Sequence, residues 1–467
     1  SDDTEIRKII RDMAYKNGIV QTTGLTEDVS TYSMYYDFKE PVAKIVSHRI
    51  LAINRGEREK FLQVKIEVPE DDMVDTIKTK YIENNSPTTE LIEKAVDDAY
   101  KRLIWPSIER EIRNILTEEA EEQALSTFSK NLKHLLLQPP VKDMVIMGFD
   151  PAYRTGCKVV VVDGSGKLLD YTVCYPTPPQ NKFEESRKII LSLIEKYKVN
   201  VVSLGNGTAS RESEKFLAEI LKEVQRPISY VVVSEAGASV YSASKLGTQE
   251  FPDLDVSIRG AISIGRRLQD PLAELVKIDP KALGVGQYQH DVNQKKLSEK
   301  LSGVVEDCVN SVGVDVNTAS PSLLGYVSGI TASTATNIVK YREENGVFTS
   351  RKKFLKVPKL GPKTFEQCAG FLRVPESDNI LDNTAVHPES YDIAEKIIQL
   401  YTLEELKTKS FTENEIKEMA TTLDIGIPTL RDILAELKKP GRDPREELPA
   451  PIFRTDVLEI SDLNPGM

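Results

Sequence analysis

Two acidic residues stand directly after runs that read as buried β-strands. Asp150 follows the apolar run 144–149 and precedes Pro151, which cannot extend a strand ladder. Glu235 follows the valine-rich run 228–234. A buried strand seldom ends in a charge unless the charge caps a turn or works in a site. Because carboxylates at neighbouring strand ends suit a divalent cation such as Mg²⁺, the pair is a candidate metal site.

The positions that should complete such a site carry other residue types. Cleavage of a phosphodiester with two divalent ions needs three or four carboxylates. A later strand is followed by Asn206, which is neutral, and the final helix of the segment begins around Arg259, which repels a cation. We therefore expect no catalytic residues. Asp150 and Glu235 are vestigial candidates that hold a weakly bound Mg²⁺ ion at most, and we expect no other cofactor.

A second candidate site lies in a basic stretch of the chain. Residues 320–375 contain nine Lys and Arg residues against three Glu. Within this stretch YVSGIT (326–331) and VPKLGPK (357–363) form a near-repeat, and each precedes a helical pattern. A helix, a short glycine turn and a second helix make up the helix-hairpin-helix pattern. Its turn presents backbone N–H groups to a phosphate without reading the bases.

The residues that we expect to contact nucleic acid lie in these two turns: Ser328, Gly329, Thr331, Lys359, Gly361 and Lys363. Thr331 and Lys359 stand where such turns usually carry a second glycine. The alternative is that both hairpins only pack against neighbouring helices. The local charge and the duplication favour sequence-nonspecific binding of DNA or RNA.

The elements around Asp150 follow a recognisable order. Three strand patterns, two of them joined by the tight turn Gly164-Ser165-Gly166, precede alternating helices and strands at 182–198, 199–204, 211–224, 228–234 and 258–268. This is the element order of the ribonuclease H-like fold. The predicted fold class is multidomain and mostly α with one α/β domain, a ribonuclease H-like mixed sheet flanked by helical domains and a tandem helix-hairpin-helix.

Composition narrows the function further. The chain has 467 residues, which is too long for a single hydrophobic core, so several domains are expected. Its net charge of −11 argues against a protein that coats nucleic acid along its whole length. The four cysteines form no CxxC pair, and the four histidines form no ligand-spaced pair. Neither a signal peptide nor a long apolar run is present, so we expect a cytoplasmic protein that has no membrane partner.

Several segments closely resemble the Tex family of bacterial transcription accessory proteins. They are GFDPAYRTGCK (148–158), SHR (47–49), WPS (105–107), GQYQHD (286–291), VDVNTAS (314–320) and KPGRDPR (439–445). The resemblance implies a YqgF-like (RuvC-like) ribonuclease H fold that is not known to cut, and a helix-hairpin-helix pair. It also implies nucleic-acid binding together with the transcription machinery.

The resemblance, together with the positions of helix-breaking residues and changes in composition, predicts six parts. They are an N-terminal helical domain (1–140) with a break at Trp105-Pro106, a YqgF-like domain (141–272), a helical connector (273–317), the tandem helix-hairpin-helix (318–375), a C-terminal helical region (376–460) and a stub (461–467). Family members have further sequence before the first residue here and an S1 domain after the last. We therefore expect a core that lacks both, and the acidic charge fits the loss of that S1 domain.

The predicted function is a nucleic-acid-binding scaffold associated with transcription and without catalysis. The rival from another class is a Mg²⁺-dependent, structure-selective nuclease that uses Asp150 and Glu235. The third is a protein-interaction platform whose helical regions dock RNA polymerase or ribosome-associated machinery.

Overall fold

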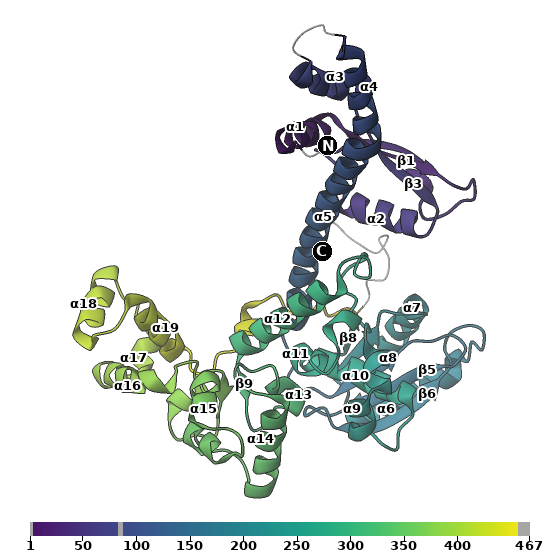
Figure 1. Ribbon diagram of the computed structural model, residues 1–467. Coiled ribbons are helices and arrows are strands. Elements are labelled where there is room, and N and C mark those ends of the chain that lie inside the picture. Colours follow the sequence, from purple (N-terminus) through teal and green to yellow (C-terminus); the bar gives the residue numbers. More distant parts are fainter. Residues whose placement is uncertain (1–2, 83–86, 456–467) are drawn as a thin grey trace. The chain divides into compact units, whose positions relative to one another are not determined.

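The computed structural model describes residues 3–82 and 87–455 of the chain (Figure 1). The chain divides into two compact units, Ser1–Asn131 with Val285–Lys300 and Leu132–Gly284 with Leu301–Met467, and each is described by itself. The expected stub 461–467 lies outside the described residues. Within the described part, every helix is too short or too polar to span a membrane.

The first unit combines helices with a small sheet. Its elements are α1 (Thr4–Asn17), β1 (Ile19–Gly24), β2 (Asp37–Pro41), α2 (Ser47–Arg58), β3 (Leu62–Glu67), α3 (Glu70–Tyr81), α4 (Thr89–Ala99) and α5 (Trp105–Leu136). The strands form an antiparallel sheet in the order β2-β1-β3. Sequence periodicity indicated β3 alone, because β2 is a polar strand that buries no residue fully and is defined by its pairing with β1.

The expected break at Trp105-Pro106 is wrong. α4 passes through one π-helical turn, Tyr100–Ile104, straight into α5. The π turn shifts the hydrogen-bond register just before Pro106, so the missing proline N–H produces a local bulge instead of a helix end. The helical pattern on either side of the proline therefore belongs to one continuous rod.

The second unit contains the predicted mixed sheet, and the fold class is confirmed. Its strands are β4 (Ile146–Asp150), β5 (Cys157–Val162), β6 (Leu168–Cys174), β7 (Val201–Gly205) and β8 (Ser229–Val233). Their order is β6-β5-β4-β7-β8, with β4, β5 and β6 antiparallel and β4, β7 and β8 parallel. Asp150 is the last residue of the central strand, as predicted.

Helices cover both faces of this sheet. α6 (Phe183–Tyr197) and α7 (Ser210–Leu221) bury their apolar residues against one face, and α10 (Val256–Gln269) packs on the other. Two short helices that the sequence did not indicate, α8 (Ala238–Ala243) and α9 (Lys245–Glu250), connect β8 to α10. α10 therefore lies over the face that carries the end of β4.

The rest of the second unit is mainly helical. It contains α11 (Pro271–Leu275), the part of α12 (Gln294–Val312) that follows Lys300, α13 (Pro321–Leu324), α14 (Ala332–Asn345), the 3-10 helix η4 (Arg351–Lys356), α15 (Pro362–Cys368) and the short paired strands β9 (Val314–Asp315) and β10 (Leu372–Arg373). Beyond them, a small separate apolar core joins α16 (Tyr391–Leu400), α17 (Leu403–Thr408), α18 (Glu413–Leu423) and α19 (Ile427–Lys438).

Candidate nucleic-acid interface and carboxylate site

Two helix-hairpin-helix units follow one another in the basic stretch. The first consists of α13, a turn and α14, and the second of η4, a turn and α15. Aromatic contacts join them inside: the fully buried rings of Phe348 and Phe354 meet edge-on, and the ring of Phe365 is tilted against Phe354. The near-repeat in the sequence therefore corresponds to a duplicated structure.

The two turns have the same backbone conformation. Gly329 and Lys359 each take the left-handed region, with φ of 78° and 67°. In each turn the next residue donates its N–H to the carbonyl oxygen three residues back (Ile330 to Val327, 3.0 Å; Leu360 to Val357, 3.1 Å). Lys359 thus adopts a conformation that glycine takes freely and that other L-residues adopt at a cost.

The position after the turn differs in a complementary way. Thr331 caps α14, because its hydroxyl accepts the Thr334 N–H at 3.2 Å. Gly361, the equivalent residue before α15, offers no side-chain cap and has extended backbone with open space around it. The first turn therefore has glycine at the left-handed position and threonine before the helix, whereas the second turn has lysine at the left-handed position and glycine before the helix.

Each turn rests on the second helix of the other hairpin. Lys359 Nζ donates to Ser333 Oγ at 3.0 Å, and Asn337 Nδ2 donates to the carbonyl of Pro358 at 2.8 Å, so the second turn contacts α14. A Cβ at Gly329 would lie 2.7 Å from Cβ of Gln367, so the first turn contacts α15. This reciprocal packing holds the two turns next to each other.

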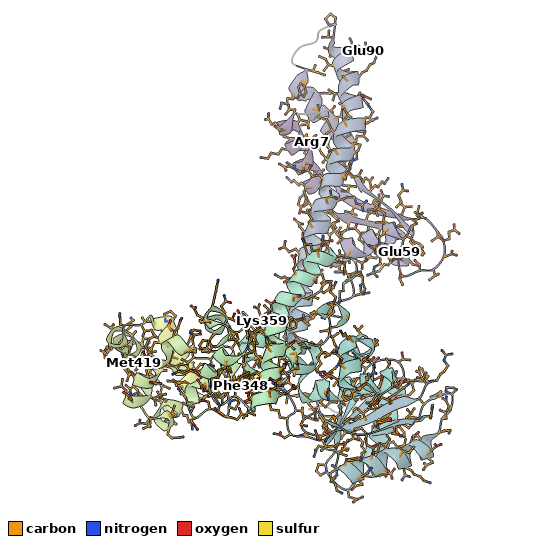
Figure 2. The ribbon with its side chains drawn as sticks, turned by 60° about the horizontal axis from the view of Figure 1, so that its bottom comes forward. Arg7, Glu59, Glu90, Phe348, Lys359 and Met419 are labelled. Carbon is orange, nitrogen blue, oxygen red and sulfur yellow. The ribbon has the colours of Figure 1, made fainter. Side chains whose placement is uncertain are left out.

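All six predicted contact residues are exposed, and Lys359 is labelled in Figure 2. Ser333, which was not among the predicted residues, is also exposed and contacts Lys359; its position two residues after Thr331 was the available signal. Fewer of the nine basic residues of this stretch are available to nucleic acid than the sequence suggested, because its three arginines donate hydrogen bonds within the fold. Arg351 is buried and donates to the carbonyls of Leu372 and Val386.

The other two arginines act in the same way, donating to the carbonyls of Val316 (Arg342) and Gly370 (Arg373). The positive charge that the hairpins expose is therefore carried mainly by lysines. Lys359 and Lys363 belong to the second turn, and neither forms an ion pair with a described residue.

The carboxylate site lies at the end of β4. The pKa of Asp150 is raised to about 6, mainly because the carboxyl is buried and to a lesser extent because of the negative charge of Glu235. The positive charge of Lys158 lowers this pKa. Burial also raises the pKa of Glu235. The structure therefore brings together the two acids that the sequence singled out, in a setting that disfavours their ionisation.

Several groups hold Glu235 in place. Asn206 Oδ1 accepts the Glu235 N–H at 3.1 Å, so the residue that replaces a carboxylate has a positioning role. Gly207 lies so close that a Cβ there would overlap the Glu235 carboxylate. From α10, Arg267 Nη1 donates to the carbonyls of Ser234 and Ala236, each at 2.7 Å, on either side of Glu235. No local sequence signal pointed to Arg267.

The expectation that Arg259 places a positive charge at the carboxylate site is wrong. Arg259 is buried and turned away, with Nε donating to the carbonyl of Phe251 and Nη1 to the hydroxyl of Thr248. Its neighbour Gly260 faces the site instead, since a Cβ there would lie 3.8 Å from Oδ2 of Asp150. Neighbouring helix positions point about 100° apart, so a shift of one residue changes which side chain enters the site.

The residues at this site do not fit the divalent ions of a catalytic ribonuclease H fold. Two ions need at least three carboxylates, and here Gly260 and Asn206 leave Asp150 and Glu235 alone. Across residues 3–82 and 87–455, no group of three or more His, Cys, Asp or Glu side chains is arranged to hold a metal ion.

Comparison with known families matches four models along the chain. The Tex central region-like model matches residues 1–128 and the Tex protein YqgF-like domain matches 144–269, together more than half of the chain. A helix-hairpin-helix motif model matches 309–373, and a further HHH domain model matches 379–445.

Curated relatives match the chain from end to end. Uncharacterized protein YdcI of Bacillus subtilis is 50% identical over 479 residues, covering all of this chain and 66% of the relative. Transcriptional accessory protein Tex of Neisseria gonorrhoeae is 45% identical (63% of the relative covered), and Protein tex of Bordetella pertussis is 43% identical (62% covered), again over all of this chain. The chain therefore spans about two thirds or less of the length of these relatives.

Proposed function

Because the chain belongs to the Tex family of transcription accessory proteins, we propose that it is a non-catalytic scaffold that binds DNA or RNA without sequence preference. The observation that carries the proposal is the reciprocal hairpin pair. Both of its turns are exposed, they are held side by side, and two exposed lysines, Lys359 and Lys363, belong to the second one.

These turns are suited to binding the phosphate groups of nucleic acid and not its bases. Backbone N–H groups beside a turn and lysine ammonium groups contact the nucleic-acid backbone, which every sequence shares. Gly361 lets a backbone approach closely because nothing lies within 4 Å of a Cβ built there. The outward part of the first turn is therefore polar, and that of the second turn is open and positively charged.

Catalysis is not part of the proposal. Asp150 and Glu235 lack the further carboxylates that two-ion cleavage uses, and Gly260 supplies no side chain where one would stand. The name of one relative, Transcriptional accessory protein Tex, describes an accessory role. We accordingly propose a nuclease-like fold that serves as a structural platform.

Protein partners are the second candidate function, and a charge contrast favours them. Residues 379–445 match an HHH domain model but contain 13 Asp and Glu against nine Lys and Arg. An acidic surface repels phosphates, so we assign this domain to protein contacts instead of nucleic acid. RNA polymerase or ribosome-associated machinery is the proposed partner class. The buried, free thiols fit the cytoplasmic location that we propose.

A matched pair of charge reversals tests the binding site. The variant Lys359→Glu with Lys363→Glu alters the second turn. The control Lys396→Glu with Lys417→Glu makes the same change in charge on exposed lysines of the acidic domain. Affinity is measured by fluorescence anisotropy for labelled duplex DNA and single-stranded RNA of several sequences over a range of salt concentrations.

We expect weak binding whose log K falls with log salt at a slope of about −2 to −4, near −0.9 for each phosphate contacted. The turn variant should weaken binding to all sequences alike and flatten the slope by about 2. The control should change affinity much less. Equal losses in both variants would mean that net charge, not the hairpin pair, governs binding.

A further inference from the structure

The antiparallel register of the sheet places a lysine directly across from the candidate metal ligand. Asp150 on β4 is the pairing partner of Lys158 on β5. Residues directly opposite in such a ladder point to the same face, with their Cβ atoms about 4.5–5.5 Å apart. The ammonium of Lys158 and the carboxylate of Asp150 therefore share the face that α10 covers.

Lys158 is buried to an unusual degree for a lysine, with 8% of its surface exposed. Its Nζ donates to Thr155 Oγ1 at 2.6 Å and to the carbonyl oxygen of Thr155 at 3.3 Å. Both acceptors are neutral, so they orient the ammonium without cancelling its charge. A nearby negative charge stabilises an ammonium that is buried in this way.

Two carboxylates supply that negative charge. Lys158 acts to lower the pKa of Asp150 against the effect of burial, and it contributes to the lowered pKa of Asp255, the N-cap of α10. The lysine thus lies within electrostatic reach of the end of β4 and of the start of α10. In a metal-dependent ribonuclease H fold, this is the region where a cation would neutralise the acids.

We infer that the Lys158 ammonium takes the place of a divalent cation at Asp150, so that this domain needs no metal ion. Arg267 already supplies a positive charge beside Glu235, so Lys158 is the second cation next to the two carboxylates, and it repels any divalent ion that approaches Asp150. The lysine is delivered by the sheet itself, so the counter-charge is present in every copy of the folded protein. This inference concerns the YqgF-like domain and is independent of binding at the hairpins.

The test asks whether removal of the lysine creates a metal site. The variants are Lys158→Gln, the charge-preserving control Lys158→Arg, and the double variant Lys158→Gln with Asp150→Asn, each in the full chain. Binding of Mn²⁺ is measured from the electron paramagnetic resonance signal of the free ion, and thermal melting is followed with and without millimolar Mn²⁺.

Wild type and Lys158→Arg should show no Mn²⁺ binding that depends on Asp150. Lys158→Gln should bind Mn²⁺ at least about tenfold more tightly than wild type and should melt at a higher temperature when the ion is present. The double variant should lose both effects. The inference is overturned if wild type binds Mn²⁺ through Asp150 as tightly as Lys158→Gln does, or if Lys158→Gln gains no binding.

A folding defect would also decide the matter. If Lys158→Gln is unfolded alone, the inference requires that Mn²⁺ or the second change, Asp150→Asn, restores a cooperative melting transition. Rescue by either one shows that the lysine compensates a charge. Failure of both would show that Lys158 serves packing alone, and the inference would be wrong.

Discussion

Gly329 and Lys359 occupy equivalent positions in two consecutive hairpin turns and share a left-handed backbone, with φ of 78° and 67°. The glycine adopts this conformation freely, whereas the lysine accepts a strain of roughly 1–2 kcal/mol. Strain is retained where the residue that bears it has a use. In the proposed nucleic-acid interface, the exposed ammonium of this lysine would contact a phosphate group.

Replacing the strained lysine should separate stability from binding. Lys359→Gly removes the strain but enlarges the entropy of the unfolded chain, so we expect a gain in the free energy of unfolding of up to about 1 kcal/mol. Affinity for nucleic acid should fall in the same variant. Lys356→Gly, in η4 where φ is not positive, should instead destabilise the fold by about 0.5–1 kcal/mol. Urea denaturation and anisotropy titration measure the two quantities. A loss of stability in Lys359→Gly would contradict this account.

Copying the first cap into the second turn should have opposite effects on the same two quantities. In Gly361→Thr, the hydroxyl can accept the Thr364 N–H as Thr331 accepts that of Thr334, and the structure leaves room for the side chain. We expect about 0.5–1 kcal/mol of added stability and weaker phosphate binding, because a donor is occupied and the approach is filled.

The matched change at the other glycine is Gly329→Ala. There a positive φ and a Cβ only 2.7 Å from that of Gln367 should lower the melting temperature. If Gly361→Thr lowers the melting temperature as well, the second turn is more tightly packed than the structure shows. If its affinity is unchanged, Gly361 does not lie at the phosphate contact.

The YqgF-like domain should not cut nucleic acid. Four-way junction, duplex and single-stranded substrates incubated with Mg²⁺ or Mn²⁺ should remain intact on denaturing gels, because the site holds two carboxylates and an ammonium. Asp150→Asn is the control for contaminating nucleases. Cleavage by the wild type that disappears in this variant would favour the nuclease hypothesis instead.

The buried carboxyl of Asp150 should make stability depend on pH. Its pKa is raised to about 6 from the ordinary 3.8, so the folded protein binds more protons than the unfolded chain between these values. Stability from this group is therefore lost as pH rises from about 4 to 6. Asp150→Asn should stabilise the protein at pH 7, on the order of 2 kcal/mol, and have little effect at pH 4.

Asp255→Asn is the comparison for this titration. The pKa of Asp255 is lowered by its hydrogen bonds to Ser257, so the sign of its contribution is reversed, and this variant should not stabilise the protein at pH 7. Thermal melting across this pH range distinguishes the two variants. Equal effects of both substitutions would mean that general charge reduction, not burial of Asp150, is responsible.

Local sequence patterns were enough to predict the strands around Asp150 and the duplicated hairpins. Both depend on local patterns. Runs of β-branched residues bounded by Gly and Pro predict strands, and a glycine turn between helical patterns predicts a hairpin. Asp150 and Glu235 were found for the same reason, since each directly follows a strand whose end the pattern marks.

The groups that those residues face could not be predicted from local patterns, because they depend on long-range packing. Whether Arg259 or Gly260 points toward Asp150 depends on the rotation of α10 against the sheet, and no local pattern records that rotation. The pairing of Asp150 with Lys158 depends on strand register. The internal role of Arg351 depends on carbonyl groups more than 20 positions away in the chain. Contacts of this kind come from long-range packing, and packing decides which charges reach solvent and which are used within the fold.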